Sequence, residues 1–404
     1  MRKTILLVAM PNSIHVVRWI RQLDGQDYDI HLFSSVGGAV IHPHPEMEGV
    51  TFHSPLFSRA TKIYKTQPGE MRPSFLFKVL NFFKQRVYEQ SMPDIRVKRL
   101  QKVIRKIRPA LVHSLEIQAA AYLTLDAKKQ FNGPFPPWLV TNWGSDIYLF
   151  GRLSEHKAKI RAVLESCDYY SCECERDITL AQQFGFCGQA MPVFPNTGGF
   201  DLASLEVERN QIPTSARKVI MLKGYQNWAG RALVGLRALS RCADILNGYS
   251  VVIYSAPPDV VIAAELFADD TGIPVRVIPH TTPHQEILSL HAQARVSIGL
   301  SISDAISTSF LEAVVMGSFP IQSCTACANE WIEHGISGMI VPPEDPDIIE
   351  IAIRTALLDD RLVDEAARIN WQTAQERLDG EFLKHRTTEM YARILQGDDV
   401  VAKR

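Results

Sequence analysis

The chain reads VSIGLSISDAISTSFLEAVVMG over residues 296–317. An apolar run ends near Leu300, a polar turn spans residues 301–307, and a pattern with helical spacing follows. A buried strand, a short turn and a helix in this order form the repeating unit of a parallel α/β sheet. The stretch therefore predicts a strand whose carboxyl end leads directly into a helix that begins near Ser307.

The start of this predicted helix has the features of an anion site. Backbone N–H groups at Ser307 and Thr308 lack partners inside the helix, and the helix dipole favours negative charge there. Asp304 precedes the helix and Glu312 lies one turn further in, so two carboxylates flank the same point and can accept hydrogen bonds from hydroxyl groups. The alternative interpretation is that the two hydroxyl residues only cap the helix and that both acids are solvated.

Short apolar runs alternate with helical patterns along most of the chain, which is typical of parallel α/β proteins. We expect strands at residues 5–9, 30–34, 110–113, 138–141, 219–222, 250–254, 275–278, 296–299 and 319–322. We expect helices at residues 14–23, 93–107, 232–246, 284–294, 310–316, 347–358 and 381–395. The pattern lapses between Phe194 and Ala216 and then restarts. The sequence thus predicts two Rossmann-like, doubly wound domains at 1–200 and 201–375, followed by a C-terminal helix at 376–404.

Composition excludes several classes of protein. The 404 residues include 43 Lys and Arg and 44 Asp and Glu, so the net charge of -1 gives no global basic field for nucleic acid. A hydrophobic share of 46% and a charged share of 22% exclude a disordered chain. No apolar run approaches the roughly 18 to 20 residues of a membrane helix. The apolar N-terminal run stops at Pro11, so we expect a first strand rather than a signal peptide.

The cysteines favour reduced thiols. Seven Cys are spread over the chain without a disulfide framework, which favours the cytosol. Cys324 with Cys327 and Cys172 with Cys174 form two close pairs. A zinc site needs four ligands in closed geometry, and the sequence does not indicate that the pairs meet. We therefore expect free cysteines and no metal.

The segment from 296 to 345 resembles the donor-binding half of retaining glycosyltransferases of the GT-B fold, in particular glycosyltransferase family 4. That family has two acidic residues separated by seven positions, then Glu-Ala-Met-Ala, a Gly, and a later Glu. The corresponding residues here are Asp304, Glu312, Ala313, Gly317, Pro320, Glu330, Gly335 and Asp345. Further segments of the chain resemble bacterial members: Ser13 to Trp19, Gly144 to Ile147, the hinge Val193 to Gly198, and His284 with the residues after it.

The resemblance implies two Rossmann-like domains facing across a cleft and a retaining hexosyltransferase that needs no metal cofactor. A nucleotide-diphosphate sugar, UDP- or GDP-linked, would bind the second domain, and a glycan or lipid-linked acceptor would bind the first. Asp304 and Glu312 take the catalytic positions. Implied donor-binding residues are Lys223, Arg231, Ser307, Thr308, Glu312 and Glu330, and implied acceptor-side residues are Ser13, His15, Trp143 and Asp146. The final helix would return to the first domain and couple its closure to the second.

The chain departs from the family pattern at several of these positions. Asp304 replaces the usual Glu, and Ala305 and Ser307 stand where Gly is frequent. Trp143 stands where many members have His. Lys223-Gly224 comes before Gly230-Arg231, which reverses the usual order of the two phosphate-binding cations. These departures motivate a second hypothesis, a degenerate sugar-nucleotide binder or partner subunit. A third is another GT-B enzyme, such as an epimerase or a phosphorylase.

Residues 59–108 form a strongly basic stretch, with 14 Lys and Arg against three acids and with apolar residues between them. Such a pattern favours contact with an anionic membrane surface or an acidic acceptor. The alternative is a core-packing helix pair with a solvated basic face. Together with the resemblance, the stretch predicts a cytoplasmic enzyme of bacterial surface polysaccharide or glycolipid synthesis, peripheral at the inner face of the cell membrane.

Overall fold

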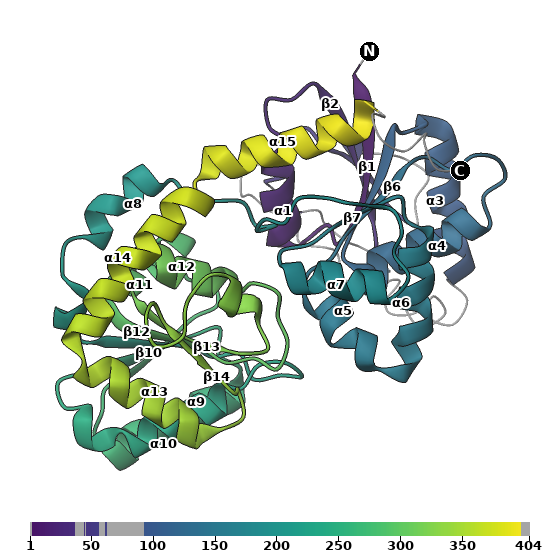
Figure 1. Ribbon diagram of the computed structural model, residues 1–404. Coiled ribbons are helices and arrows are strands. Elements are labelled where there is room, and N and C mark those ends of the chain that lie inside the picture. The colour runs from purple at the N-terminus through teal and green to yellow at the C-terminus, as the bar shows by residue number, and fades with distance from the viewer. Residues whose placement is uncertain (1, 37–43, 45, 56–60, 63–92, 397–404) are drawn as a thin grey trace, which may run out of the picture. The chain divides into compact units, whose positions relative to one another are not determined.

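The computed structural model describes residues 2–36, 44, 46–55, 61–62 and 93–396. The chain divides into two compact units, Met1–Gly198 with Lys384–Arg404, and Gly199–Leu383. Each unit contains one mainly parallel sheet with helices packed on it (Figure 1). The predicted fold class of two Rossmann-like, doubly wound α/β domains is confirmed.

The N-terminal unit contains a sheet in the order β4-β3-β2-β1-β5-β6-β7-β8, parallel except for the β3–β4 pair. Its strands are β1 (Lys3–Ala9), β2 (Tyr28–Ser34), β3 (Thr51–His53), β4 (Thr61–Lys62), β5 (Leu111–Leu115), β6 (Trp138–Thr141), β7 (Tyr169–Ser171) and β8 (Gln189–Ala190). The strand order reverses between β1 and β5. In such sheets ligands bind outside the carboxyl ends of the strands at this switch point.

The helices of this unit cover the sheet with apolar sides. They are α1 (Ile14–Arg21), α3 (Pro93–Ile107), the π-helical turn η1 (Ile117–Ala121), α4 (Tyr122–Lys129), α5 (Ser145–Tyr148), α6 (Ser154–Ser166) and α7 (Glu175–Gln183). In α3, Val97, Leu100 and Val103 are buried in the core, whereas Lys98 and Lys102 are exposed. This described end of the basic stretch is therefore a core-packing helix with a solvated basic face. Most of the stretch, residues 63–92 included, lies outside the described residues.

The C-terminal unit contains an all-parallel sheet in the order β11-β10-β9-β12-β13-β14. Its strands are β9 (Val219–Lys223), β10 (Ser250–Tyr254), β11 (Val275–Ile278), β12 (Ala294–Gly299), β13 (Phe319–Ser323) and β14 (Met339–Val341). Its helices are α8 (Leu202–Arg209), α9 (Ala232–Arg241), α10 (Pro258–Thr271), α11 (His284–Gln293), α12 (Thr308–Met316), the 3-10 turn η5 (Cys327–Glu330), α13 (Pro346–Leu358) and α14 (Asp360–Arg377). Here the strand order reverses between β9 and β12, so their carboxyl ends mark the expected ligand position.

The predicted strand–turn–helix at 296–317 is confirmed. β12 is completely buried, Ser307 occupies the N-cap position of α12 with an extended backbone, and the helix ends at Gly317, whose φ of 73° suits glycine. Phe310, Leu311 and Val314 fix the helix in the core of the unit. This packing holds the first turn of α12 at the carboxyl edge of the sheet.

The last helix, α15 (Gly380–Gln396), docks on the N-terminal unit through buried hydrogen bonds. Trp19 Nε1 donates to the Tyr391 hydroxyl over 2.9 Å, and that hydroxyl lies 2.6 Å from Nδ1 of His113. The His113 Nε2 in turn lies 2.6 Å from Thr141 Oγ1. Burial lowers the pKa of His113 to about 3, so a neutral imidazole accepts from Tyr391 and donates to the threonine.

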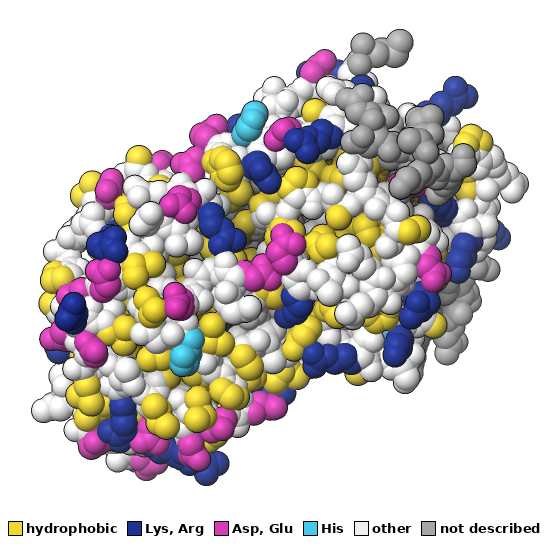
Figure 2. Space-filling model, in the orientation of Figure 1, with side chains coloured by type: hydrophobic (Ala, Val, Ile, Leu, Met, Phe, Trp, Pro, Cys, Tyr) yellow, Lys and Arg dark blue, Asp and Glu magenta, His cyan; other side chains and the backbone are white. Residues whose placement is uncertain are grey.

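On the face of the molecule drawn in Figure 2, acidic and basic side chains of the described residues are interspersed, and neither charge dominates. This agrees with the net charge of -1. None of the helices in the described part of the chain is both long and apolar enough to span a membrane.

Candidate functional site

The carboxyl edge of the C-terminal sheet brings together several of the predicted donor-side residues. Lys223 ends β9, and its Nζ donates to Ser307 Oγ at the start of α12 over 2.8 Å. The Ser307 hydroxyl also lies 2.8 Å from that of Ser309, and the Lys223 ammonium lies 4.7 Å from the centre of the Tyr225 ring. A cation thus stands beside the helix N-terminus, where both the dipole and the charge favour an anion.

The loop after Lys223 depends on close backbone approach. A Cβ on Gly224 would lie 2.8 Å from the Tyr254 carbonyl oxygen, and one on Gly230 would lie 2.2 Å from that of Tyr225. Both positions therefore require glycine. Asn227 closes the turn because its Oδ1 accepts from the backbone N–H groups of Ala229 and Gly230, at 2.9 Å each.

Arg231, the second predicted cation, is engaged within its own unit. Its Nε donates to Glu344 Oε1 over 2.8 Å, and its Nη1 donates to three backbone carbonyls of the loop, those of Asn227, Ala229 and Gly230. The guanidinium is largely buried, whereas Glu344 is 65% exposed. The arginine therefore stabilises the loop in this structure, and contact with a phosphate would replace or supplement the Glu344 pair.

Glu312 lies buried in α12 rather than on a solvated face. Its Oε1 accepts a hydrogen bond of 2.7 Å from His284 Nε2, and its Oε2 lies 3.8 Å from His291 Nε2. The Glu312 side chain is only 6% exposed. A buried carboxylate is costly unless it is paired, and here the hydrogen bond from His284 offsets that cost.

His291 is a neutral histidine behind this carboxylate. It is fully buried, its Nδ1 lies 2.9 Å from Ser297 Oγ, and the Tyr254 ring packs edge-on against it. Burial lowers the pKa of His291 to about 4, although the Glu312 charge acts in the opposite direction. The sequence pattern did not single out this residue, because a histidine within a helix that packs against a sheet resembles any core residue.

The other predicted donor-side residues lie at the same edge or close to it in the chain. Asp304 is half-buried in the β12–α12 loop, and its Oδ1 accepts from the N–H of Ala305 over 2.9 Å. Thr308 is the first residue of α12. Glu330 ends η5, and its backbone carbonyl accepts from Arg377 Nη1 over 2.7 Å.

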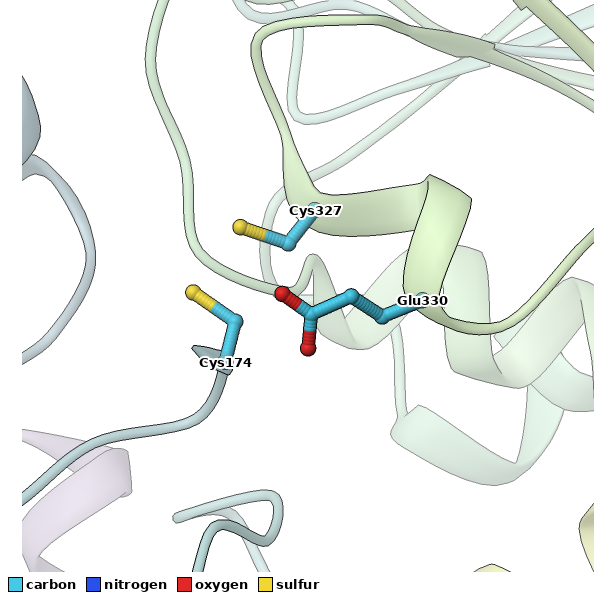
Figure 3. A group of neighbouring side chains, drawn as sticks. All are labelled: Cys174, Cys327 and Glu330. Atoms are coloured by element: carbon cyan, nitrogen blue, oxygen red, sulfur yellow. The ribbon is translucent and has the colours of Figure 1, made fainter. Parts of the chain in front are cut away.

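One cysteine of the C-terminal unit lies near Glu330. Cys327 begins η5, so its side chain and that of Glu330 come from one 3-10 turn (Figure 3). Cys174, also drawn there, belongs to the N-terminal unit. The C-terminal unit by itself thus brings together one thiol and one carboxylate.

The N-terminal unit pairs two of the predicted acceptor-side residues. Ser13 is the N-cap residue of α1, and the exposed His15 lies in the first turn of that helix. The His15 ring centre lies 5.6 Å from that of Trp143, which follows β6. An imidazole and an indole thus adjoin at the carboxyl edge of this sheet.

Asp146, the remaining predicted residue, is buried beside a second carboxylate. Its Oδ2 accepts from the backbone N–H groups of Ile117 and Trp143 at 3.0 and 3.1 Å. Glu116, directly after β5, has a φ of 81° and accepts from the N–H groups of Ala119 and Ala120. Burial and the neighbouring Glu116 raise the pKa of Asp146 to about 8. Sequence analysis did not single out Glu116, although its position directly after a central strand could have indicated a residue at the carboxyl edge of the sheet.

Comparison with known proteins agrees with this architecture. Residues 63–171 match the family model described as Glycosyl transferase 4-like. Among curated proteins, no sequence matches the chain significantly. The match falls in the N-terminal unit, whereas the resemblance seen in the sequence rested mainly on residues 296–345.

Solved structures match the chain over nearly its whole length. Sucrose-phosphate synthase from Thermosynechococcus elongatus superposes with a TM-score of 0.69 at 15% identity, covering 98% of this chain and 100% of that one. Anabaena HepE in complex with UDP-glucose superposes with a TM-score of 0.66 at 14% identity, covering 97% of this chain and 100% of that one. Trehalose 6-phosphate synthase from Burkholderia multivorans superposes with a TM-score of 0.70 at 11% sequence identity, and the match covers 100% of both chains. The fold is that of GT-B glycosyltransferases, and the sequence match is to the family-4-like group among them.

Proposed function

We propose that the protein is a retaining glycosyltransferase that moves a hexosyl group from a nucleotide-diphosphate sugar to an acceptor. The observation that carries the proposal is the edge of the C-terminal sheet, where the ammonium of Lys223 bonds to the N-cap residue Ser307 and buried Glu312 follows in the same helix. The GT-B fold supports it, because HepE of that fold was crystallised with UDP-glucose.

In this proposal the diphosphate binds at the start of α12. The backbone N–H groups of Ser307 and Thr308 and the ammonium of Lys223 stabilise the negative charge that develops on the leaving diphosphate. Arg231 contributes a second cation by exchanging Glu344 for a phosphate oxygen. The carboxylate of Glu312 accepts hydrogen bonds from the nucleoside ribose, and Asp304 and Glu330 bind the transferred sugar. The charge stabilisation comes from these groups, and we propose no metal.

The N-terminal unit takes the acceptor in this scheme. The N–H groups at the start of η1 already donate to the carboxyl groups of Glu116 and Asp146, so they are occupied and do not offer a site to an anion. Ser13, His15 and Trp143 instead offer a hydroxyl, an imidazole and an indole to a neutral or lipid-linked glycan. We propose a role in bacterial surface polysaccharide or glycolipid synthesis, at the cytoplasmic face of the membrane, with residues 59–108 as the peripheral contact.

The test is nucleotide binding measured by thermal shift with UDP, GDP, ADP and CMP and their common sugar conjugates. A ligand at about 100 times its Kd adds about 2.7 kcal/mol, which is a shift of a few degrees. We expect one diphosphate nucleotide to shift the protein, the Glu312→Gln variant to lose that shift, and the exposed Glu333→Gln variant to keep it. No shift with any nucleotide would contradict the proposal.

Turnover separates the remaining hypotheses. A transferase releases the nucleoside diphosphate from its sugar conjugate in an acceptor-dependent manner. A degenerate binder shows the thermal shift but no release. An epimerase forms the epimer or free sugar without an acceptor, and a phosphorylase requires inorganic phosphate.

A further inference from the structure

Two histidines of one helix hold the Glu312 carboxylate. His284 is the first residue of α11, and His291 follows two turns later on the same face. His284 Nε2 lies 2.7 Å from Oε1, and His291 Nε2 lies 3.8 Å from Oε2. Each carboxylate oxygen therefore faces one imidazole, so the orientation of the carboxylate about its last bond is constrained from both sides.

His291 lies on the buried side of the Glu312 carboxylate but is too far from it to form a hydrogen bond. Its Nε2 is buried and has no hydrogen-bond partner among the described residues, while Nδ1 is engaged by Ser297, whose hydroxyl lies 2.7 Å from that of Ser318. A neutral imidazole carries one N–H. The proton belongs on Nε2, because a lone pair there would face the Glu312 oxygen. At 3.8 Å this N–H attracts Oε2 but leaves both of its lone pairs available to a ligand.

His284 constrains the outer side and is accessible. Its side chain is 45% exposed, and its Nε2–H uses one lone pair of Oε1. One lone pair of Oε1 and those of Oε2 thus remain in a fixed plane. Two oxygens of one carboxylate match two neighbouring hydroxyl groups, as in the 2′,3′-diol of a ribonucleoside.

We propose that His284 is a specificity-determining residue of the donor site, which makes Glu312 select ribonucleotides over deoxyribonucleotides. The inference rests on the proposed function, since it assigns the ribose to Glu312. His284 acts as a positioning residue through the carboxylate and does not contact the sugar. A nucleotide without ribose hydroxyls leaves the oriented carboxylate unpaired, and sites built for a hydroxyl reject the analogue that lacks it.

The experiment is a thermodynamic cycle by isothermal titration calorimetry. The probe is whichever of UDP, GDP and ADP binds the wild-type protein most tightly, compared with its 2′,3′-dideoxy analogue. The variants are His284→Ala, which removes the donor, and His284→Gln, which supplies an amide N–H in its place. His280→Ala is the matched control, since His280 is exposed in the loop just before α11.

We expect His284→Ala to weaken ribonucleotide binding about tenfold, in line with the loss of a hydrogen bond to a charged group, and to leave dideoxynucleotide binding unchanged. His284→Gln should restore part of the preference for the ribonucleotide over its dideoxy analogue, and His280→Ala should retain that preference in full. An equal loss for both nucleotides, or none for either, would overturn the inference while the proposed function stands. If none of the three nucleotides binds the wild-type protein, the proposed function fails, and this inference fails with it.

Discussion

The two units place different groups at equivalent points of similar sheets, an ammonium in one and buried carboxyl groups in the other. In the C-terminal unit, the ammonium of Lys223 and the hydroxyl of Ser307 stand at the start of α12, after the central strand β12. In the N-terminal unit, the carboxylates of Glu116 and Asp146 occupy the start of η1, after the central strand β5. Backbone N–H groups at a helix start attract anions in both cases. In the proposed function, the C-terminal unit offers that site to a diphosphate, whereas the N-terminal unit fills it with its own side chains.

In the proposed function, this contrast separates the donor role of one unit from the acceptor role of the other. Asp146 accepts hydrogen bonds from the backbone N–H groups of both Ile117 and Trp143. The side chains at the start of η1 therefore connect the loops that follow β5 and β6. Substitutions at Lys223, Asp146 and Glu344 each alter one side of this contrast.

The largest expected effect comes from Lys223→Ala. Loss of the ammonium should weaken binding of a nucleoside diphosphate about 10- to 100-fold and leave binding of the free nucleoside unchanged, because the charge-assisted contact is made to phosphate. Calorimetric titration with both ligands measures the difference. Lys218→Ala is the matched control, since Lys218 lies at the opposite end of β9, over the Tyr249 ring. Equal losses for diphosphate and nucleoside would place the phosphates elsewhere.

A change in pH dependence is expected from Asp146→Asn. The folded-state pKa of Asp146 is raised to about 8, first by burial and then by Glu116, against an ordinary value near 3.8. The folded protein therefore binds this proton more tightly than the unfolded chain. The resulting stabilisation is complete below about pH 4 and is lost as the pH rises through about 8.

Urea unfolding at pH 5 and pH 8.5 measures this linkage. We expect the stability of the wild-type protein to fall more between the two pH values than that of the Asp146→Asn variant. Asp126→Asn, which removes a half-exposed partner of Lys159, should follow the wild-type dependence. Parallel pH profiles of the Asp146→Asn variant and the wild-type protein would show that the carboxyl is already ionised at pH 5.

The smallest effect is expected from Glu344→Gln. Glu344 is 65% exposed, and exposed ion pairs contribute about 0 to 1 kcal/mol, so the unfolding free energy should change by less than about 1 kcal/mol. Release of the Arg231 guanidinium should raise diphosphate affinity by about threefold or less. Urea unfolding and nucleotide titration check the two values. A weaker diphosphate complex would show that Arg231 acts only as a support of its loop.

The sequence predicted the fold well where local pattern and tertiary packing agree. The strand at 296–299 and the helix start at Ser307 were correct, since a mainly apolar run followed by a polar turn and a hydroxyl N-cap has one simple interpretation. The strands β7 and β14 were missed, because each has three residues and too short a pattern to show a period. The helices α10 and α14 were missed as well, although they are long.

The sequence named the residues of the candidate site, but it did not predict their burial or their hydrogen-bond partners. Glu312 was expected one turn into the helix as an acceptor for hydroxyl groups, and its two histidine partners come from residues 21 and 28 positions earlier in the chain. Such contacts depend on how α11 packs against α12, which no local pattern encodes. The strained Glu116 was missed for the same reason, because its φ of 81° is imposed by the hydrogen bonds of η1 and the neighbouring strands.

Hydrogen-exchange mass spectrometry with and without the nucleoside diphosphate tests the central claim most directly, because it locates the bound ligand within the chain. We predict protection of the backbone amides in residues 300–312 and 219–231, at the edge formed by β9, β12 and α12. Residues 116–121, whose helix start is filled by carboxylates, should exchange at the same rate in both states. Protection confined to the N-terminal unit would contradict the assignment of the donor to the C-terminal sheet.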